Sequence, residues 1–396
     1  MVNARQSRLG FAILSGLLLS SPAVFAAPPD TDAVAQRLVA AAAVKEGEVV
    51  AISGQAHSAQ LVEDIAVNVR RLGAFPLVFY SSDRLSKRMF FDVPAKYDAQ
   101  SDALDMKLVE LIDVRISVSD GLTEDLFAGA DPARMAARGK AGEPIGQAAL
   151  KRGVRSVDVG NGFYPTPWRA KRFGMEEQAL SDVFWEGIAV DPAAIQAQGA
   201  SVAAALAAGG KLHITHPNGT DLTVQLEARP ATVSDGVITA EDMKAGGAAV
   251  SIYVPAGEVY TVPKAGTANG KVVHSHDFFR GKPVDDVTVE YKDGRAVSMT
   301  GTGPGYADFR AAYDAVQDPR KDAFGFVDFG VNPNVKLAAG SQVGAWVPAG
   351  TITVGSGGNT WAGGDNSVPF AWTAFLPGST VTLDGKTLID GGVLKL

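Results

Sequence analysis

The sequence predicts a chain of two domains, an α/β domain followed by a strand-rich α+β domain. Its 396 residues are enough for two hydrophobic cores, and the absence of cysteine means that these cores form without disulfides. Helical and strand patterns alternate up to about residue 200, which is typical of a parallel sheet flanked by helices. Short strands separated by turn signals follow. We therefore assign residues 27–200 to the first domain and residues 201–396 to the second.

Helices and strands are expected to alternate along the first domain. Residues 31–44 and 57–72 carry apolar side chains at helical spacing, and Gly73 stands where the second of these helices would end. Short apolar runs predict strands at residues 48–52, 77–80, 114–118 and 154–159.

The second domain is expected to be built mainly from hairpins. After a helix at residues 201–208, strands are predicted at 212–215, 222–226, 250–254, 287–291, 296–299, 381–383 and from 388 onward. Asn218-Gly219, Asp293-Gly294 and Asp384-Gly385 mark tight turns between successive strands. One helix, at residues 306–316, interrupts this series.

Residues 1–26 have the pattern of a secretory signal peptide. Arg5 and Arg8 precede an apolar run at residues 9–19, and small residues lead to a cleavage site after Ala26 or Ala27. The run is too short to span a bilayer comfortably, although an N-terminal anchor is the alternative. We expect an exported protein, periplasmic or secreted, with no membrane attachment after cleavage.

Composition excludes several classes of function. The net charge of −7 becomes −9 when Arg5 and Arg8 are removed with the signal, so binding to nucleic acid is not expected. The lack of cysteine rules out a cysteine nucleophile and any thiolate metal site. The motifs G-x-S-x-G, H-E-x-x-H and the P-loop pattern are absent from the sequence.

Histidines are the remaining candidates for acid–base or metal chemistry. His274 and His276 would point to the same side of a strand, an arrangement that can clamp a metal ion; the alternative is a solvated strand end. His57, His213 and His216 are more typical of capping, surface and turn positions.

A series of segments in the second half resembles the aminopeptidase T family of metallo-aminopeptidases. The segment Pro255-Ala256-Gly257-Glu258 matches its P-x-G-E motif, and Gly330-Val331-Asn332-Pro333 matches its G-x-N-P turn. Further similar segments lie in the family's order at residues 217–223, 269–273, 293–297, 350–355 and 380–385. The resemblance implies the family's two-domain architecture and, in its relatives, a site in which two zinc or cobalt ions activate water.

Only one of five metal ligands implied by the resemblance is kept, the glutamate at Glu258. The other four positions fall on Phe326, Thr353, Phe370 and Trp372. Aromatic rings do not ligate zinc, so apolar packing is expected to fill the former metal cavity. A buried Glu258 would then need a polar partner or partial exposure.

Two functional hypotheses, and a third structural one, follow from these substitutions. The first is a non-catalytic or diverged protein that keeps a cleft between its domains and binds a peptide or a similar small ligand, with no cofactor. The second is an exported aminopeptidase whose zinc or cobalt site is rebuilt from Glu258 and Asp328, with Asp365, His274 and His276 as further candidates. The third is a subunit of an assembly, since the resemblance also suggests a homodimer.

Overall fold

The structure is a computed structural model that describes residues 30–338, 340–368 and 370–396. The predicted signal peptide at residues 1–26 lies outside the described residues. Among those that are described, no helix combines the length and apolarity needed to cross a bilayer.

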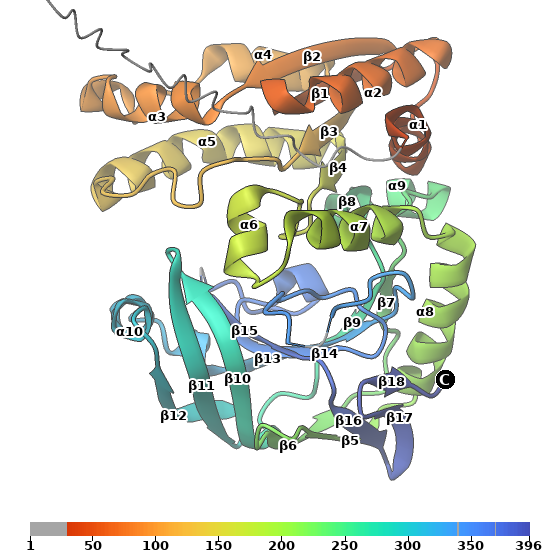
Figure 1. The fold of residues 1–396 in the computed structure, drawn as a ribbon, viewed down its shortest axis with the longest axis vertical. Helices are drawn as coiled ribbons and strands as arrows, with labels where there is room; N and C mark the ends of the chain where they lie inside the picture. Colours follow the sequence, from red (N-terminus) through yellow and green to blue (C-terminus); the bar gives the residue numbers. More distant parts are fainter. Residues whose placement is uncertain (1–29, 339, 369) are drawn as a thin grey trace, which may run out of the picture.

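A parallel sheet forms the first layer of the molecule, with the strand order β2-β1-β3-β4-β8 (Figure 1). Its strands are β1 (Val49–Gln55), β2 (Phe75–Ser81), β3 (Val114–Val118), β4 (Arg155–Val159) and β8 (Ser251–Val254). The first five helices, which precede or connect its first four strands, are α1 (Thr31–Ala41), α2 (Ala59–Arg71), α3 (Asp83–Phe91), α4 (Ala103–Leu111) and α5 (Pro132–Arg152). The alternation predicted from the sequence is therefore present, and one side of α2 buries Leu61, Ile65 and Val69 in the first core, as their spacing indicates.

Strand β8 differs from the prediction, which placed residues 250–254 among the strands of the second half. In the structure β8 pairs in parallel with β4, from Ser156↔Ser251 to Val159↔Val254. Its alternating apolar residues identify a strand but not its neighbour, because parallel partners are distant in sequence and share no turn.

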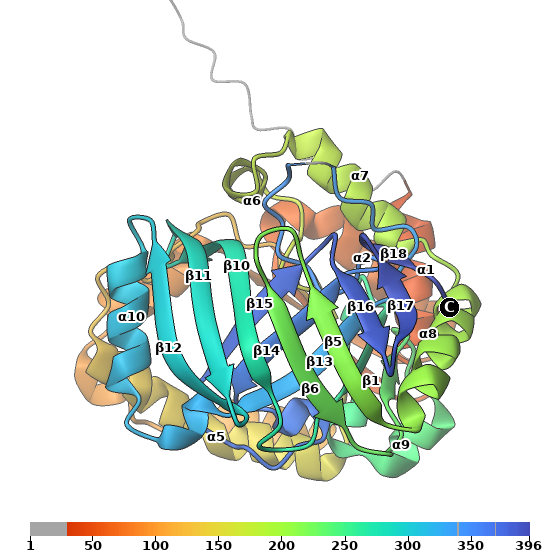
Figure 2. The same cartoon turned by 90° about the horizontal axis from the view of Figure 1, so that it is seen from below.

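Two packed antiparallel sheets build the second half. We call them sheet B, ordered β12-β11-β10-β6-β5-β16-β17-β18, and sheet C, ordered β15-β14-β13-β9-β7. Sheet B comprises β5 (Gly210–Thr215), β6 (Asp221–Leu226), β10 (Asn269–Phe279), β11 (Lys282–Lys292), β12 (Arg295–Thr302), β16 (Thr380–Leu383), β17 (Lys386–Asp390) and β18 (Val393–Leu394). Sheet C comprises β7 (Thr232–Ser234), β9 (Glu258–Thr261), β13 (Phe324–Gly330), β14 (Ile352–Gly357) and β15 (Ala371–Leu376). Figure 2 shows sheet B in front of sheet C.

Five further helices complete the described fold. They are α6 (Pro167–Arg172), α7 (Glu177–Ile188), α8 (Pro192–Ala207), α9 (Ala240–Ala245) and α10 (Tyr306–Ala315). Helices α6 and α7 lie between the parallel sheet and sheet C (Figure 1).

Sheet C has two faces of different character. Val259, Val327, Phe329 and Val354 point into the core shared with sheet B. The residues that alternate with them point the other way, toward the first layer. The motif residues Glu258, Phe326, Asp328 and Thr353 belong to this second face.

Candidate functional site

The loop from β8 to β9 brings together the two motifs that stand out in the sequence. Gly257 has φ +128°, and a Cβ at this position would lie 2.7 Å from the Cβ of Asn332 and 2.9 Å from its backbone nitrogen. Asn332 is buried and donates from Nδ2 to the carbonyls of Ala256 (2.7 Å) and Gly187 (3.1 Å). The P-x-G-E segment is thus fixed against the G-x-N-P turn, which sets the position of Glu258 at the start of β9.

Gly257→Ala is expected to lower the free energy of unfolding by about 2–3 kcal/mol, because the added methyl group meets Asn332 at an unfavourable φ. Equilibrium unfolding in urea would measure the change. Gly246→Ala is the matched control, since Gly246 also has a positive φ (+67°) but its Cβ would meet nothing within 4 Å. Equal losses in the two variants would contradict the close approach at Gly257.

Glu258 is partly exposed and has a polar partner. The sequence predicted that this side chain would need one or the other. Asn161 donates from Nδ2 to Glu258 Oε1 at 3.3 Å. Burial raises the pKa of the Glu258 carboxyl to about 7, although the hydrogen bond from Asn161 acts in the opposite direction. Near neutral pH this side chain therefore exists in both protonation states.

Asp328 lies on β13, one strand away from Glu258. It is fully buried, between Tyr260 on β9 and Thr353 on β14, and neither of its carboxyl oxygens has a hydrogen-bond partner of good geometry among the described residues. Burial raises its pKa well above the ordinary value, the charge of Glu258 raises it further, and the Phe329 amide lowers it slightly. We call Glu258 and Asp328 the carboxyl pair; it titrates as a unit rather than as two independent acids.

A cluster of aromatic rings lies on the same face of sheet C as the carboxyl pair. Phe326, two residues before Asp328, is buried, and its ring centroid lies 4.9 Å from that of Trp361 and 5.8 Å from that of Trp346. Trp346 also contacts Phe375 at 5.1 Å, and Tyr260 contacts Trp361 at 5.1 Å. The expectation of aromatic filling is met at Phe326, with tryptophans from two loops completing the cluster.

Glycine makes room for this aromatic cluster. Gly355 on β14 lies opposite Phe326, and a Cβ at this position would come within 2.7 Å of the phenyl ring. Thr353, two residues earlier, is fully buried, and its hydroxyl has no hydrogen-bond partner among the described residues. The position to which the resemblance assigns a histidine ligand thus carries a hydroxyl on the strand beside Asp328.

Phe370 and Trp372 do not take part, which corrects the assignment made from the sequence. Trp372 belongs to the core between sheets B and C, and Phe370 packs against that core with its ring 5.2 Å from Tyr313. Both therefore lie on the side of sheet C that faces away from the carboxyl pair. A shift of one residue in a strand exchanges its faces, and the largely irregular segment before β15 carries no pattern that fixes the register.

The candidates for a rebuilt metal site have other partners. His274 is buried beside Phe375 (5.9 Å between ring centroids), with its Nδ1 3.8 Å from Asp277, and burial lowers its pKa. His276 lies 2.5 Å from Asp285, and Asp365 is exposed. Within the described ranges, no three or more histidine, aspartate or glutamate side chains are grouped as metal ligands would be.

Two of the remaining histidines occupy the surface and turn positions expected for them, whereas His57 neither caps a helix nor lies on the surface. His213 pairs with Asp221 at 2.8 Å, and His216 contacts the carbonyl of Pro377 at 2.7 Å. His57 lies 3.5 Å from Asp120, close to the carboxyl end of the parallel sheet.

A second polar group, which the sequence did not reveal, lies at the carboxyl ends of β3 and β4. We call Asp120, Asp158, Asn161 and Arg169 the carboxyl-edge cluster. Asp120 is buried and accepts hydrogen bonds from the backbone N–H of Gln55 at 3.0 and 3.3 Å. Asn161 connects this cluster to the carboxyl pair through its hydrogen bond to Glu258.

The charges of the carboxyl-edge cluster are strongly influenced by burial. Burial lowers the pKa of the Arg169 guanidinium to about 10, with a further contribution from Arg172, while the nearby Asp120 and Asp158 raise it. Burial likewise raises the pKa of Asp158, against the hydrogen bond from Ser119. Polar residues that directly follow predicted strands are a sequence signal that could have indicated part of this cluster. Arg169 comes from α6, and no local pattern in the sequence links it to those residues.

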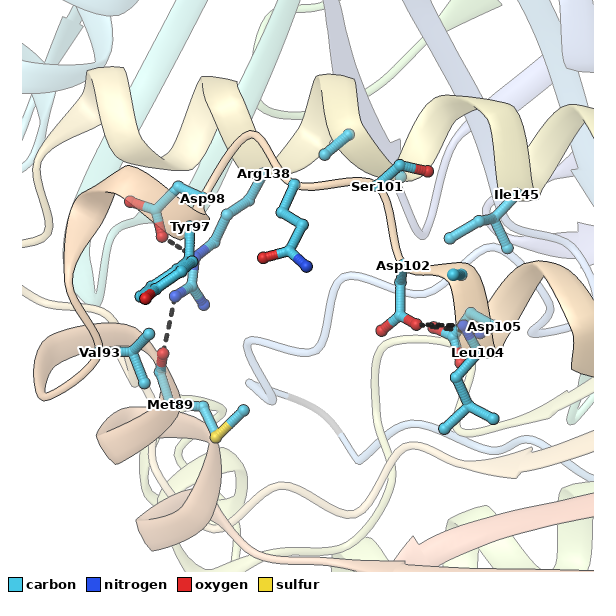
Figure 3. A pocket seen from close by; sticks show the side chains of 14 residues that line it. Met89, Val93, Tyr97, Asp98, Ser101, Asp102, Leu104, Asp105, Arg138 and Ile145 are labelled. Carbon is cyan, nitrogen blue, oxygen red and sulfur yellow. Dashed lines mark hydrogen bonds and ion pairs between the residues drawn. The ribbon is translucent and has the colours of Figure 1, made fainter.

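A pocket of about 620 Å³ lies elsewhere in the first domain, between α3, α4 and α5 (Figure 3). Its charged groups serve the fold: Arg138 donates to Asp98 and to the carbonyl of Met89, both at 2.7 Å, and Asp102 caps α4. These contacts join the helices around the pocket, so its size alone does not make it the candidate site.

Comparison with known proteins gives a family match and several similar solved structures, of which two are described here. The profile of the family described as thermophilic metalloprotease (M29) matches residues 31–304. Wild-type AmpT from Thermus thermophilus superposes with a TM-score of 0.68 and 20% identity, covering 92% of this chain and 99% of that chain. A 2,5-dihydroxypyridine dioxygenase from Pseudomonas putida KT2440 superposes with a TM-score of 0.59 and 16% identity, covering 93% and 98%.

A search of curated proteins gave no match. The two structural matches establish a shared fold at these low identities. One of them is named a dioxygenase, whereas the matching family is described as a metalloprotease. The fold therefore does not determine the reaction, and the function has to be argued from the site.

Proposed function

The chain belongs to the thermophilic metalloprotease (M29) family, and from this premise we propose that it is an exported member that binds a peptide or a similar small ligand without two-metal hydrolysis. The observation that carries the proposal is the carboxyl pair, Glu258 and Asp328, on the same face of sheet C as the aromatic cluster around Phe326. The pattern of residues 1–26 supports export.

The donor set does not fit a pair of zinc or cobalt ions. Each such ion takes about four nitrogen or oxygen donors, commonly including imidazole. The strand positions beside Asp328 carry Tyr260 and Thr353, and Phe326 precedes it on the same face. Because burial raises the pKa of both carboxyls, two divalent ions would also have to compete with protons for the carboxyl pair.

One observation favours the alternative, an exported metal-dependent aminopeptidase with a rebuilt site. The two oxygens of Asp328 lack hydrogen-bond donors of good geometry among the described residues, and a buried carboxylate with so little compensation is a group that a cation would stabilise. The hydroxyl of Thr353 is similarly unpartnered within the described part of the chain. Metal binding is therefore the property that separates the two hypotheses.

Metal analysis of the purified chain from residue 27 onward is the direct test. We expect substoichiometric zinc, cobalt and manganese, no cleavage of aminoacyl anilides, and a rise in melting temperature with short peptides. Glu258→Ala should leave the metal content unchanged. Near-stoichiometric metal together with anilide cleavage that Glu258→Ala abolishes would contradict the proposal and support the rebuilt enzyme.

Export is tested separately, by fusing residues 1–26 to a reporter that is active only outside the cytoplasm. We expect activity with the native segment and its loss when Leu17, Leu18 and Leu19 are replaced by charged residues, since the apolar run is what the export machinery recognises. Equal reporter activity from the native and charged segments would contradict export by this signal.

A further inference from the structure

The carboxyl-edge cluster lies beside the place where open parallel sheets bind ligands, with Asp120 at that place and Asp158 and Asn161 one strand further along, at β4. In the strand order β2-β1-β3-β4-β8, the chain goes from β1 to its neighbour β2 on one side, and the later strands β3, β4 and β8 are added on the other side. The switch point of the sheet therefore lies between β1 and β3. Ligands of such sheets bind beyond the carboxyl ends of the strands at this point. Asp120 follows β3, and Asn161 follows β4 by two residues.

Two opposite charges in the cluster lack an ionic partner within the described part of the chain. The five N–H donors of Arg169 are used once among the described contacts, by Nη1 to the carbonyl of Tyr164 at 3.3 Å. Asp158 accepts from the Ser119 hydroxyl at 2.8 Å. Among the described residues, neither Arg169 nor Asp158 lies within 4.0 Å of an oppositely charged group.

Both side chains are also accessible. Arg169 and Asp158 are partly exposed, as are Asn161 and Glu258 beside them. The guanidinium carbon of Arg169 lies 4.4 Å from the ring centroid of Trp168, and this stacking holds the charge in a defined orientation. The Arg169 cation and the Asp158 anion are thus both accessible to solvent at the carboxyl end of the sheet. Each is close enough to shift the pKa of the other, but the two do not form an ion pair.

We propose that this edge binds a zwitterionic ligand, a free amino acid or a short peptide, with Arg169 donating to its carboxylate and Asp158 accepting from its ammonium group. This assignment rests on the proposed ligand-binding function and names the chemical class of the ligand. Arginine presents two parallel N–H groups that match a carboxylate. An ionic ligand would also relieve the cost of holding both charges partly buried without partners.

Hydrogen bonds within the cluster also connect the proposed ligand site to the carboxyl pair. The backbone N–H of Asn161 donates to Asp158, and its side chain donates to Glu258. A ligand bound at Asp158 is therefore two hydrogen bonds away from Glu258.

Calorimetric titration with L-alanyl-L-leucine, its C-terminal amide and its N-acetyl form tests the assignment on the whole mature chain. In the native protein, we expect either modification to weaken binding about 10- to 100-fold, because each removes one charge-assisted contact. Arg169→Gln should bind the free peptide and the amide equally, and Asp158→Asn should bind the free and acetylated peptides equally. Arg310→Gln is the control, since Arg310 pairs with the exposed Asp314 on α10.

Equal affinity of the native protein for all three peptides would overturn the assignment while leaving a ligand-binding function intact. Lack of binding to any of them would overturn the assignment and count against the proposed function as well. The comparison of the three peptides on the native protein needs no variant, so it decides the matter even where Arg169→Gln fails to fold.

Discussion

Asp328→Asn is expected to increase the free energy of unfolding at pH 8 by about 1 kcal/mol or more, since each unit by which folding raises the pKa of a carboxyl corresponds to about 1.4 kcal/mol of lost stability above that pKa. The reason is that Asp328 is fully buried with no hydrogen-bond donor of good geometry to its carboxyl oxygens among the described residues, and Glu258 adds a like charge. The native chain must keep a proton on Asp328 or bury a charge there. An asparagine of the same shape avoids both costs.

The stability of the native protein should decrease as the pH rises from about 4.5 to about 7. In this interval the unfolded chain loses the Glu258 proton first, because the pKa of this carboxyl is raised to about 7 in the folded state. The folded state then binds more protons than the unfolded state, so a rise in pH favours unfolding. For Glu258 the total loss is on the order of 3 kcal/mol, and Glu258→Gln should flatten this part of the profile.

Urea denaturation between pH 5 and pH 8, after dialysis against a chelator, measures both effects. The exposed Asp365→Asn should leave stability unchanged and serves as the control. A metal centre would give the opposite result, since Asp328→Asn would then remove a ligand and lower stability in metal-containing buffer. A destabilised Asp328→Asn protein whose deficit disappears on chelation would therefore contradict a metal-free carboxyl pair.

The sequence predicted the strands of the parallel sheet and several hairpin strands of sheet B because their signals are local, whereas no strand of sheet C is among those predicted from apolar patterns. Helical spacing located α1 and α2, and Asn218-Gly219 and Asp293-Gly294 located turns that the structure contains. The sheet to which β8 belongs could not be predicted in the same way, because Ser251 of β8 pairs with Ser156 of β4, 95 residues earlier, and nothing in either strand specifies the other.

The site was predicted in part, for a comparable reason. Glu258, Phe326, Asp328 and Thr353 lie on regular strands, where alternation determines the face, and the structure places all four on one face of sheet C. Trp372 follows an irregular loop, so its face could not be read from the sequence. The tryptophans at 346 and 361 were expected to be packing groups, but only the structure shows that they pack on Phe326.

Phe326→Glu, which introduces the residue type that the resemblance implies at this position, is expected to lower the free energy of unfolding by at least about 4 kcal/mol. The substitution removes a buried ring that contacts Trp346 and Trp361, and a change of this size in a core costs about 3–5 kcal/mol. It also introduces a third carboxyl group beside Glu258 and Asp328, which adds charge repulsion in a buried position. Phe326→Leu, which keeps the site apolar, should cost about 1–2 kcal/mol.

Zinc provides the decisive comparison for this variant. If the aromatic cluster has replaced the metal cavity, zinc should not restore the stability of Phe326→Glu, because a third carboxylate without imidazole leaves the ions short of donors and Trp346 and Trp361 still occupy the space. Zinc-dependent recovery to near native stability would mean that the cavity is separated from a working metal site by a single side chain. A single residue, Phe326, would then be the cause of the missing metal ligation, and the packing of sheet C and its two loops would not.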